Sequence, residues 1–232
     1  MTTQPLHVTL WEENLTQVQA CSVHPFVQGL GDGTLDADAF RGYVAQDAFF
    51  LGAFFSAYAL ATAKAVEQID VAQRLHRLMG GVLDELKLHE GYAESLSIEL
   101  VNVRPYPATR AYTDFLLHTA WTAEVGEIVA AMTPCMRLYA HLGQGLATHD
   151  HSGNPYRDWI ATYSSPEFEA LASELESLLD HLAEDSREVA GMYRYAMRCE
   201  FDFFTACLPS DGDGGTPEIH GGGAVRRGTS SR

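Results

Sequence analysis

Two acidic side chains stand where a helix would surround them with apolar neighbours. A helical residue contacts the residues three and four positions away, so these flanking positions report its surroundings. Every flank of Asp47 and Glu200 is apolar or aromatic, namely Tyr43, Val44, Phe50 and Leu51 for the first and Ala196, Met197, Phe203 and Phe204 for the second. An ionised carboxylate there is costly unless it is paired or hydrogen-bonded. A structural carboxylate satisfied by a Tyr, an Arg or the backbone is one interpretation, but the pattern favours an acid with a shifted pKa that transfers protons.

Cys135 is surrounded in the same way, by Ala131, Met132, Leu138 and Tyr139. The alternative interpretation is packing, because buried cysteine is common as a small hydrophobic residue. Two features favour a reactive thiol. Pro134 starts or kinks a helix and leaves backbone groups unpaired nearby, and Tyr139 places a phenol one turn later on the same face. An activated thiol needs a base within reach. No histidine falls on these apolar stripes, so we expect Asp47 and Glu200 to serve.

Two further groups of polar residues predict weaker sites. Glu85 and His89, four positions apart, could be two ligands of a metal, but a di-iron bundle needs Glu-x-x-His pairs from two helices and no second set is present. His149, Asp150 and His151 fall in a Gly-containing loop. We expect both groups to be structural or solvated, and we predict neither a bound metal nor a cofactor.

The segments that must position these residues have helical periodicity. Apolar residues recur at spacings of three and four in Thr9–Cys21, Asp36–Val66, Val71–Leu100, Ala108–Ala123, Val125–Leu146, Glu167–Ala183 and Arg187–Leu208. Turn-forming residues such as His24-Pro25 and Ser164-Ser165-Pro166 separate them. No stretch alternates with period two for long enough to be a strand. The sequence therefore predicts an all-α, multi-helix bundle of about seven helices in one domain spanning residues 1–209.

The composition limits the classes of partner. Hydrophobic residues make up 46% of the 232 residues, and 31 acidic against 15 basic residues give a net charge of −16. Nucleic acids and anionic membranes call for clustered Lys and Arg, so we expect neither as a partner, and no apolar run reaches the length of a membrane span. Four cysteines without a CxxC pair, and no leader at the N-terminus, predict reduced thiols in a cytoplasmic protein. Residues 210–232, rich in Gly and Ser, predict a disordered tail or an expression remnant.

Short motifs follow one another in order along nearly the whole predicted domain, from about Leu10 to Leu208. They are His24–Leu30, the turn Asp32–Leu35, Phe40–Tyr43, Gln46-Asp47, Ala111–Leu116, Pro134-Cys135 with Tyr139, Tyr163–Phe168 and Glu200–Phe204. In this order the motifs resemble the TenA family (thiaminase II, aminopyrimidine aminohydrolase), in its cysteine-containing branch.

The resemblance implies a haem-oxygenase-like bundle without haem, assembled as a homotetramer. It implies hydrolysis of 4-amino-5-aminomethyl-2-methylpyrimidine to the 5-hydroxymethylpyrimidine and ammonia, with cleavage of thiamin as a related activity. By position, Cys135 would be the nucleophile that adds to the pyrimidine ring. Asp47 would bind the pyrimidine amino group, and Glu200 would bind a ring nitrogen and move protons to and from the leaving amine.

The resemblance also implies roles for four aromatic residues. Tyr139 and Tyr163 would hold the carboxylate and thiol network, Tyr112 would contact the ring, and Phe50 would stack on it. Many family members carry Tyr where this chain has Phe50, so an aromatic wall remains while a hydroxyl is lost. Two alternatives stay open. An oxidase or oxygenase on the same bundle would need several inward histidines, and a pyrimidine-binding regulator without turnover would not need the thiol.

Overall fold

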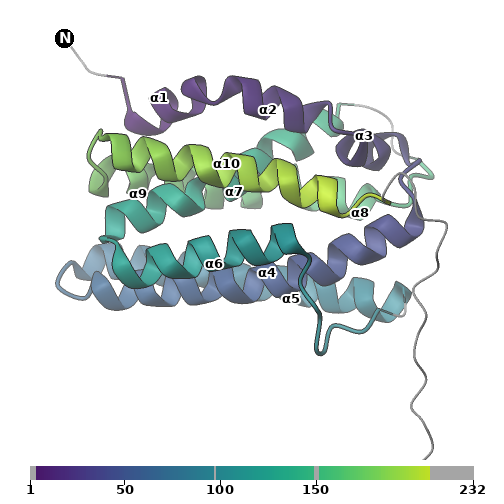
Figure 1. The fold of residues 1–232 in the computed structure, drawn as a ribbon, viewed down its shortest axis with the longest axis horizontal. Helices are drawn as coiled ribbons and strands as arrows, with labels where there is room; N and C mark the ends of the chain where they lie inside the picture. The colour runs from purple at the N-terminus through teal and green to yellow at the C-terminus, as the bar shows by residue number, and fades with distance from the viewer. Residues whose placement is uncertain (1–3, 97, 149–151, 210–232) are drawn as a thin grey trace, which may run out of the picture.

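The computed structural model describes residues 4–96, 98–148 and 152–209, and every regular element in these ranges is a helix (Figure 1). The ten described helices are α1 (Leu6–Glu13), α2 (Leu15–Ser22), α3 (Pro25–Asp32), α4 (Ala37–Lys64), α5 (Ile69–Leu96), α6 (Pro107–Thr122), α7 (Val125–Leu146), α8 (Arg157–Tyr163), α9 (Pro166–Leu182) and α10 (Arg187–Ala206). The predicted all-α bundle is confirmed. The predicted number of helices was too small, because short helices form around residues that we took for turns.

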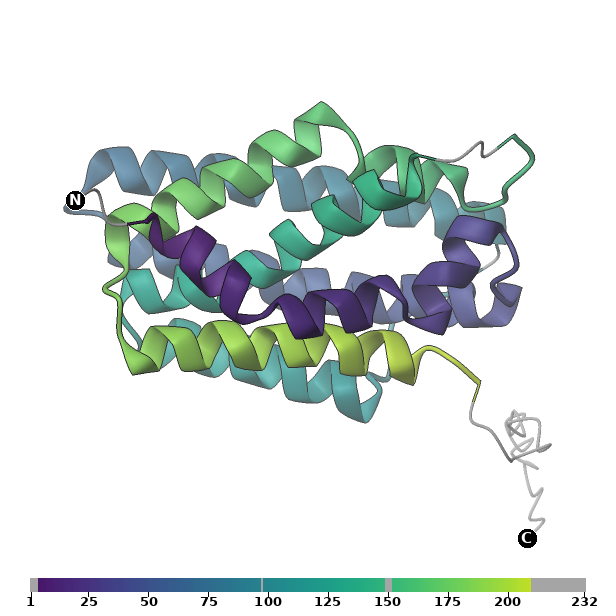
Figure 2. The same ribbon diagram turned by 90° about the horizontal axis from the view of Figure 1, so that it is seen from above.

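Helix α7 lies at the centre of the bundle. It contacts α4, α6, α8, α9 and α10, while α4 packs along α5 and against α6. Figures 1 and 2 show the N-terminal helices α1 to α3 running along α10 on one side of the molecule, where α2 and α3 contact it. Residues far apart in the sequence therefore meet around α7.

The interior contains many tyrosines. The largest side chains with less than 2% of their surface exposed include Trp159, Tyr43, Tyr58, Tyr112, Tyr163 and Tyr193. A buried tyrosine hydroxyl usually finds a hydrogen-bond partner. Asp47, His89 and Glu200 are buried in the same interior. The core is therefore apolar at its margins and polar at its centre.

Two helix starts fall where the sequence predicts them. The side chain of Asp36 accepts hydrogen bonds from the backbone N–H groups of Asp38 and Ala39, which satisfies two of the unpaired donors at the start of α4. Ser165 caps α9, and Pro166 occupies the first helical position, where a missing N–H costs nothing. These caps fix the register of α4, which carries Asp47, and of α9.

Three features of the helix boundaries were not expected. His24-Pro25 separates two helices, as the sequence predicts, but the second of them, α3, was not expected; Pro25 is its first residue, and the His24 ring accepts from the Phe26 N–H at 3.2 Å. The segment Thr9–Cys21 was expected to be one helix, but it divides at Asn14, whose buried side chain donates back to the α1 backbone. Helix α8 was not expected at all.

Helix α4 also departs from the expectation that no apolar run could span a membrane. By length and composition alone α4 could do so, because an 18-residue window in its 28 residues has a mean hydropathy of 1.4. Neighbouring helices bury 56% of that window. The apolar content of α4 therefore supplies the core of the bundle, and its buried face carries Asp47.

Candidate active site

Glu200 on α10 lies at the centre of the bundle, with 2% of its surface exposed. Its four flanking residues are all buried. The hydroxyl of Tyr112, on α6, donates to Oε1 of Glu200 over 2.6 Å. The thiol of Cys135, on α7, lies close enough to the same carboxyl group for each group to shift the pKa of the other. Three helices thus bring an acid, a phenol and a thiol to one point.

The electrostatics of this point favour protonated groups. Burial raises the pKa of Glu200 to about 8, with a further rise from the charge of Asp47, although hydrogen bonds from Tyr112 and Cys135 oppose the shift. Burial, followed by the nearby charges of Glu200, Glu85 and Asp47, raises the pKa of Cys135 well above its ordinary range. The resting group is therefore a thiol, and a thiolate forms when the neighbouring carboxylate accepts its proton.

Asp47 is held by two donors. The Tyr43 hydroxyl donates to Oδ2 over 3.1 Å, and Nε2 of His89, on α5, lies 2.8 Å from the same oxygen. Nδ1 of His89 lies 2.9 Å from the backbone carbonyl of Glu85, which can only accept, so Nδ1 carries a proton. Burial lowers the pKa of His89, but the hydrogen bond to Asp47 and its charge outweigh burial and raise that pKa to about 9. His89 and Asp47 therefore form a buried ion pair at neutral pH.

A third buried contact joins Glu85 to α8. The Tyr163 hydroxyl donates to Oε1 of Glu85 over 2.5 Å. Burial and the charge of Asp47 raise the pKa of Glu85, while His89 and the hydrogen bond from Tyr163 lower it, and the net direction is upward. Glu85 is partly buried, since one side of it reaches a surface groove. It connects the interior cluster with solvent.

Tyr43 links the remaining aromatic residues to Asp47. Its hydroxyl accepts from Nε1 of Trp159 over 3.1 Å while it donates to Asp47. The Tyr139 hydroxyl lies close enough to that of Tyr43 to influence its pKa. Tyr139 packs edge-on against Tyr163 with ring centroids 4.9 Å apart. These contacts fix the rings around the two carboxylates.

Phe50 provides an apolar wall beside Glu200. Its ring centroid lies 4.7 Å from that of Tyr112 and 6.2 Å from that of Phe203. Phe50 lies one turn beyond Asp47 on α4, so both side chains face the buried interior of the bundle. Phe50 carries no hydroxyl, so it offers only an apolar face to this site.

The structure brings together the residues singled out from the sequence. Tyr112 hydrogen-bonds Glu200, Tyr43 hydrogen-bonds Asp47, and Cys135, Tyr139 and the two acids lie close enough to shift one another's pKa values. Tyr163 lies beside Tyr139 but donates to Glu85. Whether these residues act on a substrate stays a prediction.

One expectation about polar residues in α5 is wrong: a histidine does reach the apolar stripe that holds Asp47, since Nε2 of His89 lies 2.8 Å from Oδ2 of Asp47. Of the two alternatives expected for Glu85 and His89, structural or solvated, the contacts favour the structural one, because His89 is buried and Glu85 is partly buried. The flanking test missed both because they lie four positions apart, so each is the polar neighbour of the other. Their spacing drew attention to the pair as possible metal ligands, but it did not indicate the contact with Asp47.

The part of the chain that the structure describes contains no group of three His, Cys, Asp or Glu side chains placed to hold a metal ion. His149, Asp150 and His151 lie outside the described residues, as do residues 210–232. The four cysteines carry free thiols, and Cys21, Cys199 and Cys207 are buried.

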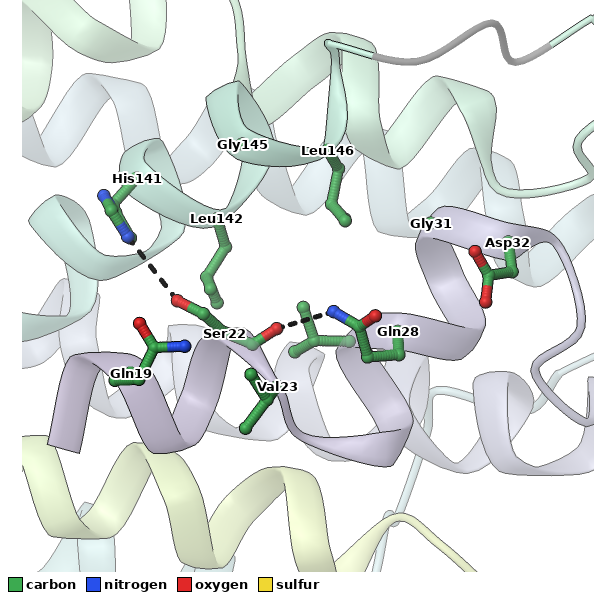
Figure 3. Close-up of a pocket in the computed structure, with 11 residues that line it drawn as sticks. Gln19, Ser22, Val23, Gln28, Gly31, Asp32, His141, Leu142, Gly145 and Leu146 are labelled. Atoms are coloured by element: carbon green, nitrogen blue, oxygen red, sulfur yellow. Dashed lines mark hydrogen bonds between the residues drawn. The ribbon is translucent and has the colours of Figure 1, made fainter. Parts of the chain in front are cut away.

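A cavity lies away from the cluster of Asp47, Glu200 and Cys135. It has a volume of about 630 Å³ and opens between α2, α3 and α7 (Figure 3). Leu142 and Leu146 point into it from α7, and Ser22 and His141 face each other 3.5 Å apart at one end. Burial and the charge of Arg137 lower the pKa of His141, so it is neutral at pH 7. None of the clustered acids or the Cys135 thiol lines this cavity.

Comparison with known sequences identifies related proteins. The model of the TENA/THI-4/PQQC family matches residues 9–209. An aminopyrimidine aminohydrolase of Bacillus subtilis is 36% identical over 170 residues, which cover 72% of this chain and 72% of that protein. The mitochondrial bifunctional TH2 protein of Arabidopsis thaliana is 35% identical over 209 residues. That match covers 78% of this chain but 34% of the plant protein, so the chain spans about a third of that relative.

Comparison with solved structures concerns the fold. A TenA homologue protein from P. horikoshii OT3 superposes with a TM-score of 0.81 at 24% identity, over 88% of this chain and 98% of that one. The arrangement of helices is therefore shared along nearly the whole described chain.

Proposed function

The chain belongs to the TENA/THI-4/PQQC family, and on that premise we propose that it is a hydrolase of thiamin salvage. The reaction proposed is the conversion of 4-amino-5-aminomethyl-2-methylpyrimidine to its 5-hydroxymethyl counterpart and ammonia. Thiamin cleavage is a related activity of the same site. Relatives named aminopyrimidine aminohydrolase at 36% and 34% identity support this assignment. The homotetramer that the resemblance implies and the cytoplasmic location that the cysteines predict remain predictions.

One observation carries the proposal: the Tyr112 hydroxyl donates to a buried carboxyl group, that of Glu200, whose pKa is raised to about 8 and which lies close to the Cys135 thiol. Such a group can accept and return a proton near neutral pH, as a general acid and base must. The thiol of Cys135 is a nucleophile only as the thiolate. The carboxyl of Glu200 is the nearby group that can accept its proton.

The residues perform the proposed reaction in balanced steps. Glu200 takes the thiol proton, and the Cys135 sulfur forms a bond to a ring carbon of the pyrimidine. The amine nitrogen receives the proton from Glu200, and the C–N bond breaks with its electron pair passing to nitrogen, which releases ammonia. Water then adds to the exocyclic carbon and gives a proton to Glu200. The S–C bond breaks, and the sulfur recovers that proton. The net change is replacement of the amine by the hydroxyl of water.

The other clustered groups bind rather than react in this proposal. Asp47, which is paired with His89, accepts hydrogen bonds from the ring amino group. Phe50 supports the ring face, and Tyr112 holds the carboxyl of Glu200 in position. The charge of Asp47 also helps to keep the pKa of Glu200 raised.

Substitution of the thiol tests the proposal. We expect Cys135→Ser to lower ammonia release from the aminomethylpyrimidine by at least about a hundredfold, because serine is a far weaker nucleophile at neutral pH. Cys199→Ser is the matched control, since it makes the same change at a buried cysteine on α10. Full activity of the Cys135 variant would exclude the covalent step.

Measurements of ligand binding, iron content and oxygen consumption, made beside the ammonia assay, distinguish the alternatives. A pyrimidine-binding regulator would bind the aminomethylpyrimidine, seen by calorimetry, without releasing ammonia. A metal-dependent oxidase would contain stoichiometric iron in the purified protein and would consume oxygen.

A further inference from the structure

Trp159 is a buried side chain that no step of the proposed reaction uses. It lies on α8, and 1% of its surface is exposed. Its Nε1 donates a hydrogen bond to the Tyr43 hydroxyl over 3.1 Å, and that hydroxyl donates to Oδ2 of Asp47, also over 3.1 Å. A single tyrosine therefore stands between the indole and the carboxylate proposed to bind the pyrimidine amino group.

The direction of the hydrogen bonds in this chain follows from the groups at its two ends. The indole N–H of Trp159 can only donate, so the Tyr43 oxygen accepts from it and directs its own proton to Asp47. At the other end, the Glu85 carbonyl can only accept, so Nδ1 of His89 donates to it while Nε2 lies 2.8 Å from Oδ2 of Asp47. Both ends of the chain therefore have a fixed direction.

These contacts hold one oxygen of Asp47 and leave the other for a ligand. Among the residues that the structure describes, Tyr43 and His89 are the hydrogen-bond partners of this carboxylate, and both contact Oδ2. Because a carboxylate group is planar, fixing Oδ2 also fixes where Oδ1 lies. A carboxylate that is oriented before the ligand arrives binds it with a smaller loss of conformational freedom.

Contacts at the start of α8 place the indole. A helix of seven residues is marginal in water on its own, so its surroundings must position it. Nδ2 of Asn154 donates to the carbonyl of Leu30 over 2.9 Å, and the Tyr156 hydroxyl donates to the carbonyl of Leu35 over 2.6 Å. These bonds tie the segment before α8 to the residues between α3 and α4, and Trp159 reaches Tyr43 from this anchored helix.

We propose that Trp159 is a positioning residue: acting through Tyr43, it orients the Asp47 carboxylate so that Oδ1 receives the amino group of the pyrimidine. This inference rests on the proposed function and adds to it a residue that does not touch the substrate. The interaction between Asp47 and the amino group is present before and during the reaction alike, so its loss raises KM and leaves kcat nearly unchanged.

Removal of the indole donor tests the proposal. Trp159→Phe keeps an aromatic ring at this place but has no N–H for Tyr43. We expect KM for the aminomethylpyrimidine to rise about threefold to tenfold, with kcat within about twofold of wild type. Trp11→Phe is the matched control, because it makes the same change on α1, where the ring packs against His141 with centroids 5.4 Å apart. The control should change neither constant, and an unchanged KM for Trp159→Phe would overturn the proposal.

A double variant separates positioning from loss of packing. Tyr43→Phe removes the donor to Asp47 itself, so we expect KM to rise about tenfold or more. Combining Trp159→Phe with Tyr43→Phe should raise KM no further than Tyr43→Phe alone, because the indole acts only through the hydroxyl. Effects on KM that multiply would mean that the two residues act separately, and the proposal would be wrong.

Binding measurements distinguish failure of this proposal from failure of the proposed function. If wild type released no ammonia, the proposed function would be wrong, but calorimetry with 4-amino-5-hydroxymethyl-2-methylpyrimidine would still test Trp159. That ligand carries the same ring amino group, so Trp159→Phe should weaken its binding about threefold to tenfold. Equal affinities of variant and wild type, or no binding by wild type, would overturn the inference.

Discussion

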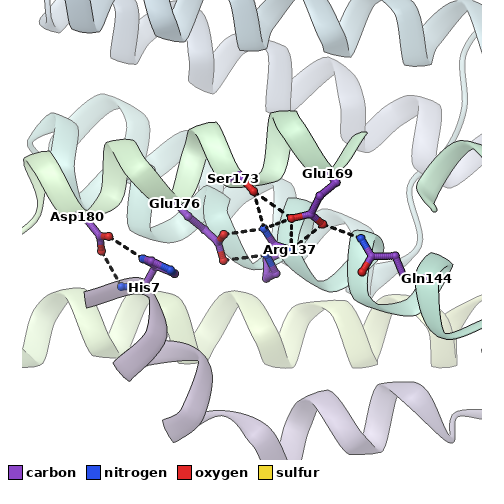
Figure 4. A network of polar contacts seen from close by, with 7 residues as sticks. All are labelled: His7, Arg137, Gln144, Glu169, Ser173, Glu176 and Asp180. Carbon is purple, nitrogen blue, oxygen red and sulfur yellow. Dashed lines mark hydrogen bonds and ion pairs between the residues drawn. The ribbon is translucent and has the colours of Figure 1, made fainter. Parts of the chain in front are cut away.

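Helix α7 faces a cluster of polar residues on each of two sides. The two clusters differ in whether an arginine binds the glutamates. One side presents Cys135 to Glu200 in the interior. The other presents Arg137 to α9, where its guanidinium binds both oxygens of Glu176 at 2.6 and 2.8 Å and both oxygens of Glu169 at 2.9 and 3.0 Å (Figure 4). Gln144 also donates to Glu169. Cys135 and Arg137 are therefore only two positions apart on α7, yet they face two different clusters of acidic residues.

The pKa values of the two clusters move in opposite directions. Burial raises the pKa of Glu169, but hydrogen bonds from Gln144 and Arg137 outweigh burial and lower it overall. The pKa of Glu200 rises to about 8, because burial exceeds the effect of its neutral donors. A guanidinium holds a carboxylate in its charged form across the physiological range, whereas a phenol and a thiol do not.

This difference indicates what each cluster is for. The Arg137 network keeps its charges fixed and joins α7 to α9, so we expect it to contribute stability. The Glu200 cluster keeps a proton that it can release near neutral pH, so we expect it to contribute reactivity at a cost in stability. Glutamate thus contributes to stability in one cluster and to reactivity in the other, and the hydrogen-bond donors around it decide which.

The largest effect expected from this comparison is on activity. Glu200→Gln should lower ammonia release by about a hundredfold to ten-thousandfold, because the amide cannot exchange a proton with Cys135. It should not lower the melting temperature at pH 8, since the amide keeps an acceptor for Tyr112 and has no charge to bury. Glu176→Gln is the matched control on the other side of α7.

The control should show the reverse pattern. Glu176→Gln removes one charge from the Arg137 network, so we expect lower stability and activity within about threefold of wild type. Equal losses of activity in the two variants would show that the clusters are not functionally distinct.

The second effect is on stability. Arg137→Met should lower the free energy of unfolding by about 2–3 kcal/mol, because Glu176 would be left buried without its cation. This lies below the usual cost of unpairing a fully buried charge, since 16% of the Arg137 side chain and 36% of the Glu169 side chain are exposed. Chemical unfolding at pH 7 measures it. An unchanged midpoint and slope would mean that the network is energetically silent.

The long helices could be predicted from the sequence, whereas the short ones could not. Helices such as α4 and α5, with 28 residues each, show many repeats of the apolar spacing, whereas α3 and α8, with eight and seven residues, show about two turns. Two turns cannot establish a period. Proline also misled the prediction of the short helices, because a proline can mark either a break or the start of a helix. Pro25 is the first residue of α3.

The site was predictable where a polar residue stands alone among apolar ones. Asp47, Glu200 and Cys135 satisfied that condition, and all three lie in one cluster. His89 did not, because its contact with Asp47 joins residues 42 positions apart on two different helices. Local spacing reports the neighbours on one helix, but not which helix packs beside it.

The third effect is on the pH dependence of stability, and its sign follows from Glu200. The folded-state pKa, about 8, exceeds the ordinary value of 4.5, so the folded protein holds a proton that the unfolded chain releases. The stability from this group is therefore full below pH 4.5 and is lost as the pH rises through 8. Between pH 6 and 8 we expect wild type to lose about 1–2 kcal/mol more than Glu200→Gln, measured by urea unfolding.

The Arg137 side of α7 should not contribute over the same interval. Glu169 has a lowered pKa, so its stabilising effect is present above pH 4.5 and is lost only on acidification. A wild-type curve parallel to that of Glu200→Gln would contradict the raised pKa of Glu200.

The smallest effect separates a network from a single pair. Nε of Arg74 on α5 lies 2.6 Å from Oε1 of Glu174 on α9, with 20% and 32% of the two side chains exposed. Arg77 lies 3.5 Å from the same oxygen, so Glu174 keeps a cation after Arg74→Met. We therefore expect a loss of stability below about 1 kcal/mol, which shrinks further in 1 M salt, measured by urea unfolding beside Arg137→Met. A loss as large as that of Arg137→Met would mean that each arginine between α9 and its neighbours contributes equally. The burial of Glu176, which distinguishes the Arg137 network here, would then not be the reason for its strength.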